Sequence, residues 1–227
     1  MNPVYIPASE LTDWRKLLAD PEKHWRENYS AMSIATAWHN ADGFPVAIAK
    51  MFGAAGEPFH SMAPLLIIPE HKVELPGGKR AAQNDVWVLA RHSAGLASIT
   101  VEGKVSEPFG ETLTDWLKNA SDGKRERLEF LKHTLGLTKD FPESVRYQLL
   151  HRTASAVIEA KRFRADTALM LVHSFSRGDV GFQDFQAFVA LFGVTAAVGE
   201  VVHLTTVDDV ALHAAWARDV GVPPVPV

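Results

Sequence analysis

Two carboxylates and one amine near the middle of the chain have the types and spacing for hydrolytic chemistry: Asp85, Glu102 and Lys104. Residues 84–90 and 96–102 are rich in β-branched and aromatic side chains and flank a turn-prone segment, a pattern that predicts a β-hairpin. If the turn is symmetric, Asp85 lies opposite Glu102 on one face, and Lys104 returns to that face two residues later. The sequence therefore predicts that these three side chains converge.

Directly opposed carboxylates repel each other at a Cβ separation of roughly 5 Å unless a proton or a cation lies between them. Hard oxygen ligands suit Mg²⁺ or Mn²⁺, which bind through one or two carboxylates and keep several waters. A neighbouring lysine can position an attacking water or stabilise charge that develops on phosphorus. The residues point to metal-assisted phosphodiester hydrolysis. The structural alternative is that Asp85 caps a turn and that Glu102 and Lys104 form an ordinary solvated ion pair.

A family resemblance enters at the same residues. Asn84-Asp85 and Glu102-Gly103-Lys104 resemble the two-part signature of the PD-(D/E)XK nuclease-like superfamily, with Asn84 where the first part often has proline. The resemblance implies an α/β, restriction endonuclease-like fold with an αβββαβ core, a mixed sheet flanked by helices. It implies catalytic roles for Asp85, Glu102 and Lys104, and a Mg²⁺ or Mn²⁺ site made by Asp85, Glu102 and the Gly103 carbonyl. Nucleic acid is the partner that it implies.

The elements that must position these residues are predicted in the order that this fold requires. We expect a single domain over 1–227, with N-terminal helices in 1–60, the sheet core in 61–205, and a C-terminal helix and tail in 206–227. Helices are predicted over 9–19, 30–41, 46–52, 113–117, 125–135, 140–163, 182–192 and 208–218, and further strands over 65–68, 168–175 and 200–204. Extra helices are expected at the N-terminus and at 113–135, between the third strand and the long helix. Many superfamily members carry an acid on the helix before the sheet, and residues 30–41 hold none.

The predicted long helix over 140–163 carries a polar stripe that includes Gln148 and Arg152, with His151 beside it. Some branches of the superfamily have a glutamine or arginine here that orients the site or contacts phosphates. The resemblance therefore implies substrate contacts for Gln148, Arg152 and His151. A solvated polar face is the alternative.

Other polar residues near the predicted strands favour structural interpretations. Glu70 could reach the carboxylates, but a solvent-facing position at a strand end is the expectation. Glu107 could assist the site or lie near a helix start, where the helix dipole favours an acid. His173 and His203 follow apolar strand residues, so we expect both to be buried, hydrogen-bonded core histidines.

Composition restricts the function classes. The chain has 227 residues, no cysteine and a formal net charge of −4, which excludes disulfides, thiol nucleophiles and cysteine-based zinc sites. No signal-peptide pattern or long apolar run is present, so the expectation is a cytoplasmic protein without a membrane partner. The negative charge weighs against strong binding of duplex DNA, although nucleic acid stays a candidate partner.

Two other classes of function lack their sequence motifs. A serine hydrolase needs a G-x-S-x-G turn, and a nucleotide-binding α/β protein needs a glycine-rich loop after its first strand; the sequence has neither. A catalytically inactive protein of the same fold, acting as a binding or interaction module, remains the main rival to the nuclease hypothesis.

Overall fold

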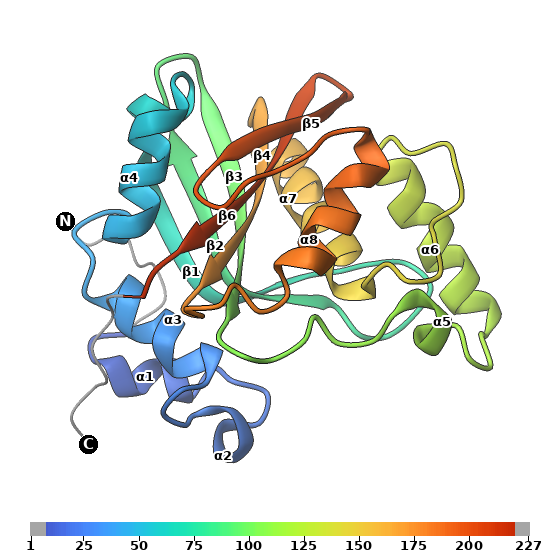
Figure 1. The fold of residues 1–227 in the computed structure, drawn as a ribbon, viewed down its shortest axis with the longest axis horizontal. Helices are drawn as coiled ribbons and strands as arrows, with labels where there is room; N and C mark the ends of the chain where they lie inside the picture. Colours follow the sequence, from blue (N-terminus) through green and yellow to red (C-terminus); the bar gives the residue numbers. More distant parts are fainter. Residues whose placement is uncertain (1–7, 221–227) are drawn as a thin grey trace.

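The computed structural model describes residues 8–220, which form a six-stranded mixed sheet with the strand order β1-β2-β3-β4-β6-β5 (Figure 1). The strands are β1 (Ala63–Val73), β2 (Ala82–Arg91), β3 (Leu96–Lys104), β4 (Thr167–Ser174), β5 (Val201–Val207) and β6 (Val210–Arg218). β3, β4 and β6 run parallel to one another, and the other neighbouring pairs are antiparallel. The predicted α/β class and mixed sheet are confirmed.

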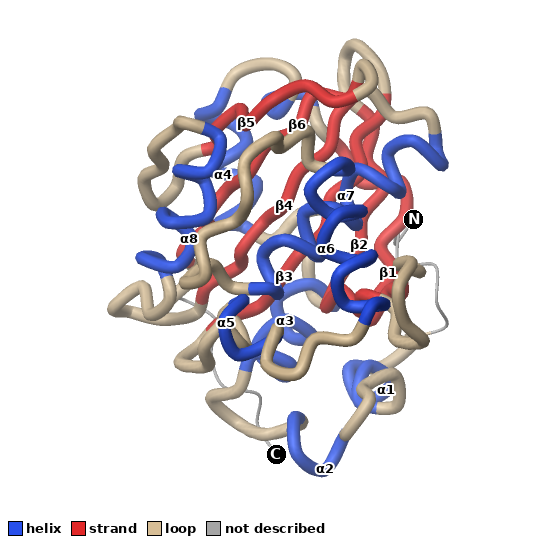
Figure 2. The backbone as a smooth tube through the Cα atoms, turned by 90° about the vertical axis from the view of Figure 1, so that its right-hand side faces the viewer, coloured by secondary structure: helices blue, strands red, loops and turns tan. Residues whose placement is uncertain are grey.

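Helices cover both faces of the sheet (Figures 1 and 2). One face carries α3 (Ser30–His39) and α4 (Val46–Ala55), preceded by the short helices α1 (Leu11–Arg15) and α2 (Pro21–His24). The other carries α7 (Tyr147–Phe163) and α8 (Phe182–Val189), with α5 (Leu113–Trp116) and α6 (Asp122–Thr134) beside them. Short 3-10 turns span Phe59–Ser61 and Ala190–Phe192. Within residues 8–220, no helix combines the length and the apolar character needed to cross a membrane.

The predicted hairpin is β2 and β3. Trp87 lies opposite Thr100, and Leu89 lies opposite Ser98, as the symmetric turn predicted. The alternate residues form a fully buried apolar face against α3 and α4: Val86, Val88, Ala90, Ala97, Ile99 and Val101. Burial of this face determines the register, because a slip of one residue would turn the apolar set toward the opposite layer.

Helix α7 is the crossover between the parallel strands β3 and β4, and it positions the polar residues discussed below. Its apolar side, including Leu149, Ala156 and Ala160, is completely buried against the sheet. All of β4 is buried, as expected for a parallel strand that is covered on both faces. The polar stripe of α7 consequently lies over the carboxyl-terminal part of β3.

Several predicted boundaries are wrong. The helix expected over 208–218 is strand β6, because Asp208 (φ 48°) and Asp209 (φ 65°) form a two-residue hairpin turn with positive φ at both central positions. The long helix begins at Tyr147 and not at 140, since 145–146 pair with 112–113 instead. The first helix covers only Leu11–Arg15. The Pro-rich tail at 222–227 lies outside the described residues.

The two strand histidines differ. His173 is fully buried on β4, where its Nδ1 accepts a hydrogen bond from Trp38 Nε1 at 3.2 Å, so the prediction of a core histidine is confirmed. His203 is exposed, and the same prediction is wrong for it. The reason is that β5 is an edge strand with one face toward solvent.

Candidate active site at the end of the hairpin

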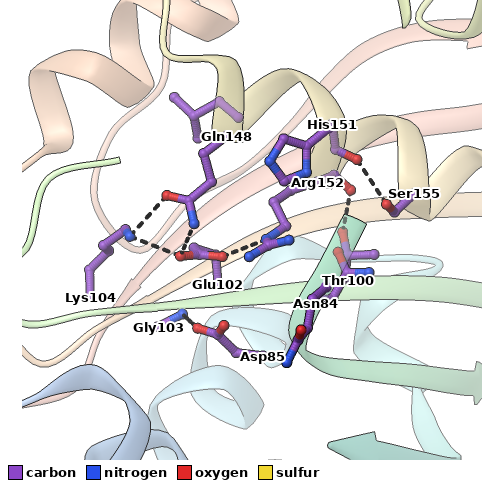
Figure 3. A network of polar contacts seen from close by, with 12 residues as sticks. Asn84, Asp85, Thr100, Glu102, Gly103, Lys104, Gln148, His151, Arg152 and Ser155 are labelled. Atoms are coloured by element: carbon purple, nitrogen blue, oxygen red, sulfur yellow. Dashed lines mark hydrogen bonds and ion pairs between the residues drawn. The ribbon is translucent and has the colours of Figure 1, made fainter. Parts of the chain in front are cut away.

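Glu102 is the centre of a buried polar network between β3 and α7 (Figure 3). Its Oε1 accepts hydrogen bonds from Lys104 Nζ at 2.8 Å and Gln148 Nε2 at 2.7 Å. Its Oε2 accepts one from Arg152 Nε at 2.6 Å. The side chains of Glu102 and Lys104 are only 4% and 5% exposed, so these charges compensate one another inside the protein and not in solvent.

Helix geometry brings the two α7 residues to this carboxylate. Gln148 and Arg152 are four residues apart and therefore lie on one face of α7. The Thr100 hydroxyl donates to the Arg152 carbonyl at 2.9 Å, which ties the helix to β3. Gln148 Oε1 also accepts a hydrogen bond from Lys104 Nζ at 3.1 Å, and this ammonium lies 4.7 Å from the centre of the Phe109 ring. Gln148 thus holds the lysine and the glutamate together.

The network determines the charge state of Glu102. Burial alone would raise its pKa, but the positive charges of Lys104 and Arg152, with their hydrogen bonds, outweigh burial and lower the pKa to about 2. Glu102 is therefore ionised throughout the physiological pH range.

Asp85, on the neighbouring strand β2, contacts the same end of β3. The β2–β3 pairing stops one residue short of Asp85, whose Oδ2 accepts a hydrogen bond from the Gly103 backbone N–H at 2.7 Å. A Cβ on Gly103 would point toward Ile34 of α3 and would lie 3.3 Å from this oxygen. Glu102 points toward α7, whereas the Asp85 carboxylate lies against the Gly103 peptide on the α3 side of the strand (Figure 3).

The prediction that Asp85 and Glu102 share one face is therefore wrong. The neighbouring strand is distorted at the same place: the β1–β2 ladder is interrupted at Glu70 and Asp85, and Glu70 has a left-handed φ of 53°. The two carboxylates instead flank the Gly103 peptide, and they remain close enough for their charges to interact.

Glu70 is the residue whose position the sequence interpretation missed. Glu70, on β1, lies beside Asp85 of β2. It is half-buried and accepts a hydrogen bond from Gln83 Nε2 at 2.6 Å. Burial, followed by the negative charge of Asp85, raises the pKa of Glu70 to about 8. Burial, followed by the negative charge of Glu102, raises the pKa of Asp85 to about 7. This end of the sheet therefore carries more negative charge than its surroundings neutralise at pH 8.

His151 is separate from the Glu102 network. Its ring packs against Tyr147 with centroids 4.8 Å apart, and within residues 8–220 its buried Nδ1 has no hydrogen-bond partner. Burial, followed by the positive charge of Arg152, lowers its pKa well below the usual value, so the ring is neutral at pH 7. Of the three predicted α7 residues, the structure thus brings only Gln148 and Arg152 to Glu102.

A hard divalent cation would find few protein ligands at this site. Asp85 Oδ1 accepts no hydrogen bond from the described part of the chain, and the raised pKa of Asp85 shows that its charged form lacks compensation. Across residues 8–220, no three His, Cys, Asp or Glu side chains are grouped to hold a metal ion. A cation here would have to rely on Asp85, one oxygen of Glu102 and the Gly103 carbonyl, with water and substrate oxygens as further ligands, a pattern typical of Mg²⁺.

Glu107 has a structural role. Its carboxylate accepts hydrogen bonds from the backbone N–H groups of Ser30 at 2.8 Å, Val105 at 2.9 Å and Ser106 at 3.0 Å. Ser30 is the first residue of α3, so Glu107 supplies negative charge at that helix start, and not at the helix that follows it in sequence. It links the end of β3 to the helix that backs Gly103.

Comparison with known proteins adds a family assignment. Residues 7–220 match the family described as Domain of unknown function (DUF6946), and the chain belongs to that family. Searches of curated proteins and of solved structures gave no match.

Proposed function

We propose that this protein is a metal-dependent nuclease that hydrolyses phosphodiester bonds in nucleic acid. The observation that carries the proposal is the buried contact of Lys104 with Glu102 and Gln148, with Asp85 bound to the intervening Gly103 peptide. A lysine, two carboxylates and an amide meet at the carboxyl end of a parallel strand, where α/β proteins commonly bind ligands.

Topology supports the finer fold assignment. Helices precede three antiparallel strands, β1 to β3, and α7 then leads to β4, which pairs parallel with β3. This order matches the αβββαβ core of the restriction endonuclease-like fold. Helices α5 and α6 are additions before α7, and β5 and β6 extend the sheet beyond β4.

In this proposal, Asp85, Glu102 and the Gly103 carbonyl hold Mg²⁺ or Mn²⁺. The bound cation supplies Lewis acidity and a water of lowered pKa. Lys104 is the catalytic base or, as the ammonium seen beside Glu102, stabilises negative charge on the phosphate. Gln148 keeps Lys104 in place, and Arg152 keeps Glu102 ionised and oriented.

The test is a cleavage assay with single-stranded and duplex DNA and RNA, in Mg²⁺, in Mn²⁺ and in EDTA. Lys104→Met keeps the length of the side chain and removes its charge, and we expect it to lower the cleavage rate roughly 100-fold or more. The matched control is Lys72→Met, at an exposed position of β1, which should cleave like the wild type. Folding of both variants is checked by circular dichroism. Cleavage that survives in EDTA, or in folded Lys104→Met, would overturn the proposal.

A second candidate is a catalytically inactive binding module of the same fold. The observation in its favour is that both oxygens of Glu102 already have partners, two of them cationic, so a cation must compete for this carboxylate. Fluorescence anisotropy with labelled DNA and RNA distinguishes the two functions. Binding without cleavage in the presence of Mg²⁺ and Mn²⁺, unchanged in Lys104→Met, would favour the module.

A further inference from the structure

A pocket separate from the Glu102 network lies beside the face of α7 that carries Tyr147 and His151. It has a volume of about 280 Å³ and opens between the β1–β2 connection, the inserted helices α5 and α6, and the first turns of α7. The polar and aromatic residues that line it are Arg80, Glu111, Trp116, Arg127, Tyr147 and His151. None of them contributes a hydrogen bond to the Glu102 network. The pocket is small compared with most ligand pockets, so it suits one ring system with a small substituent.

The walls of this pocket are held in place by contacts that link separate parts of the chain. Arg127 donates from Nε to the Pro76 carbonyl at 2.8 Å and from Nη2 to the Leu75 carbonyl at 3.1 Å. Gly77 and Gly123 pack backbone against backbone so closely that a Cβ on either would overlap the other. The β1–β2 connection is thus fastened to α6, and the pocket is preformed.

One wall is aromatic. Trp116 and Tyr147 stack with ring centroids 4.0 Å apart and an interplanar angle of 12°, and Tyr147 in turn contacts His151. Both stacked rings are only partly buried. Trp116 and Tyr147 cover one face of each other, and Lys124 Nζ lies 5.1 Å from the centre of the Trp116 ring. A nucleobase in the pocket would therefore contact the side of Tyr147 that is turned toward His151.

The polar groups complement a base and a phosphate. The neutral His151 ring has a buried Nδ1 without a partner anywhere in residues 8–220, so it can make a hydrogen bond to the edge of a ring. Arg80 is exposed and forms no ion pair with another described residue, and Arg127 binds carbonyls and no carboxylate within that part of the chain. Two guanidinium groups against one carboxylate, Glu111, leave an excess of positive charge for a phosphate.

We propose that this pocket binds a single nucleotide, with the base against Tyr147 and His151 and the phosphate at Arg80. The choice of a nucleotide over other planar anions rests on the proposed nuclease function. Tyr147 and His151 alternate along α7 with Gln148 and Arg152, so the same helix would present one nucleotide here and support the hydrolytic site on its next face. The source is either an unpaired nucleotide of a bound strand or a free mononucleotide.

The experiment measures binding by isothermal titration in EDTA, where hydrolysis does not occur. The probes are the four nucleoside 5′-monophosphates, the matching nucleosides, inorganic phosphate and a ten-nucleotide single strand. We expect the monophosphates to bind more tightly than nucleosides or phosphate. Tyr147→Ala should weaken binding roughly tenfold or more, the usual range for loss of a base-stacking ring. The control Tyr29→Ala, at an exposed position before α3, should change nothing.

Arg80→Ala provides a second test that does not perturb the core, because this side chain is exposed. It should abolish the preference for monophosphates over nucleosides.

A single strand that binds more tightly than the monophosphates would identify the strand as the source, and the reverse order would identify the free nucleotide. Absence of monophosphate and single-strand binding, or unchanged binding in both Tyr147→Ala and Arg80→Ala, would overturn the inference. Binding of nucleotides without cleavage by the wild type would refute only the nuclease proposal.

Discussion

Substitution Asp85→Asn should make the protein more stable at pH 8. The pKa of Asp85 is raised from 3.8 to about 7, which is about 3 units, or about 4 kcal/mol at 1.36 kcal/mol per unit. A raised carboxyl pKa means that the folded state binds the proton more tightly than the unfolded state. The stability that this proton contributes is therefore lost as the pH rises from about 4 to about 7. Because Glu70 shares the repulsion, 4 kcal/mol is an upper limit.

Asparagine at position 85 can still accept the hydrogen bond from the Gly103 N–H but carries no charge. Urea denaturation in EDTA at pH 5 and pH 8 measures the effect as a difference in the free energy of unfolding. Between these two values of pH, the free energy of unfolding of the variant should rise relative to that of the wild type by up to about 3 kcal/mol, because about two of the three pKa units lie between pH 5 and pH 7. The control Asp209→Asn removes one charge at an exposed turn position that tolerates asparagine, and it measures the effect of a change in net charge alone.

An Asp85→Asn variant whose difference from the wild type is the same at pH 5 and pH 8 would refute this reasoning. It would mean that the carboxyl group of Asp85 titrates as it does in the unfolded chain. Asp85 would then not lie in an uncompensated acidic environment, and no cation would be needed there.

Three further substitutions test the supports of the site by urea denaturation. Arg152→Met removes one partner of a buried carboxylate and should cost about 3–5 kcal/mol; a loss below 1 kcal/mol would mean that the ion pair is solvated. Gly103→Ala should cost roughly 1–3 kcal/mol because its Cβ meets Ile34, and combining it with Ile34→Ala should cost less than the sum of the two; strict additivity would contradict the clash. Glu107→Ala should cost about 1–3 kcal/mol because three N–H groups, including that of Ser30, lose their acceptor; an unchanged midpoint would exclude this role.

Local patterns predicted the hairpin and its register. Alternation along β2 and β3 places Trp87 opposite Thr100, and the pattern that predicts this pairing lies within the two strands and their turn. The helical spacing of Gln148 and Arg152 likewise predicted a common face. The packing of α7 on the sheet brings this face to Glu102 and buries Arg152 there. No local sequence pattern encodes that packing.

The direction in which the Asp85 side chain points was not predictable from the sequence of its own strand. Asp85 lies opposite Glu70, whose left-handed backbone coincides with an interruption of the β1–β2 ladder, and its carboxylate binds the Gly103 N–H of β3. Strand β6 was missed for a similar reason. Its alanine-rich sequence favours a helix, but the strand is completed by pairing with β4 and β5, and tertiary pairing outweighs the local propensity.

The most direct test of the central claim is isothermal titration of the wild type with Mn²⁺ at pH 7.5, compared with the double variant Asp85→Ala and Glu102→Ala, both checked for folding by circular dichroism. The account predicts saturable heat for the wild type and none for the double variant, because the cation needs both carboxylates beside the Gly103 peptide. Flat titrations for both proteins, or equal heat from both, would contradict it.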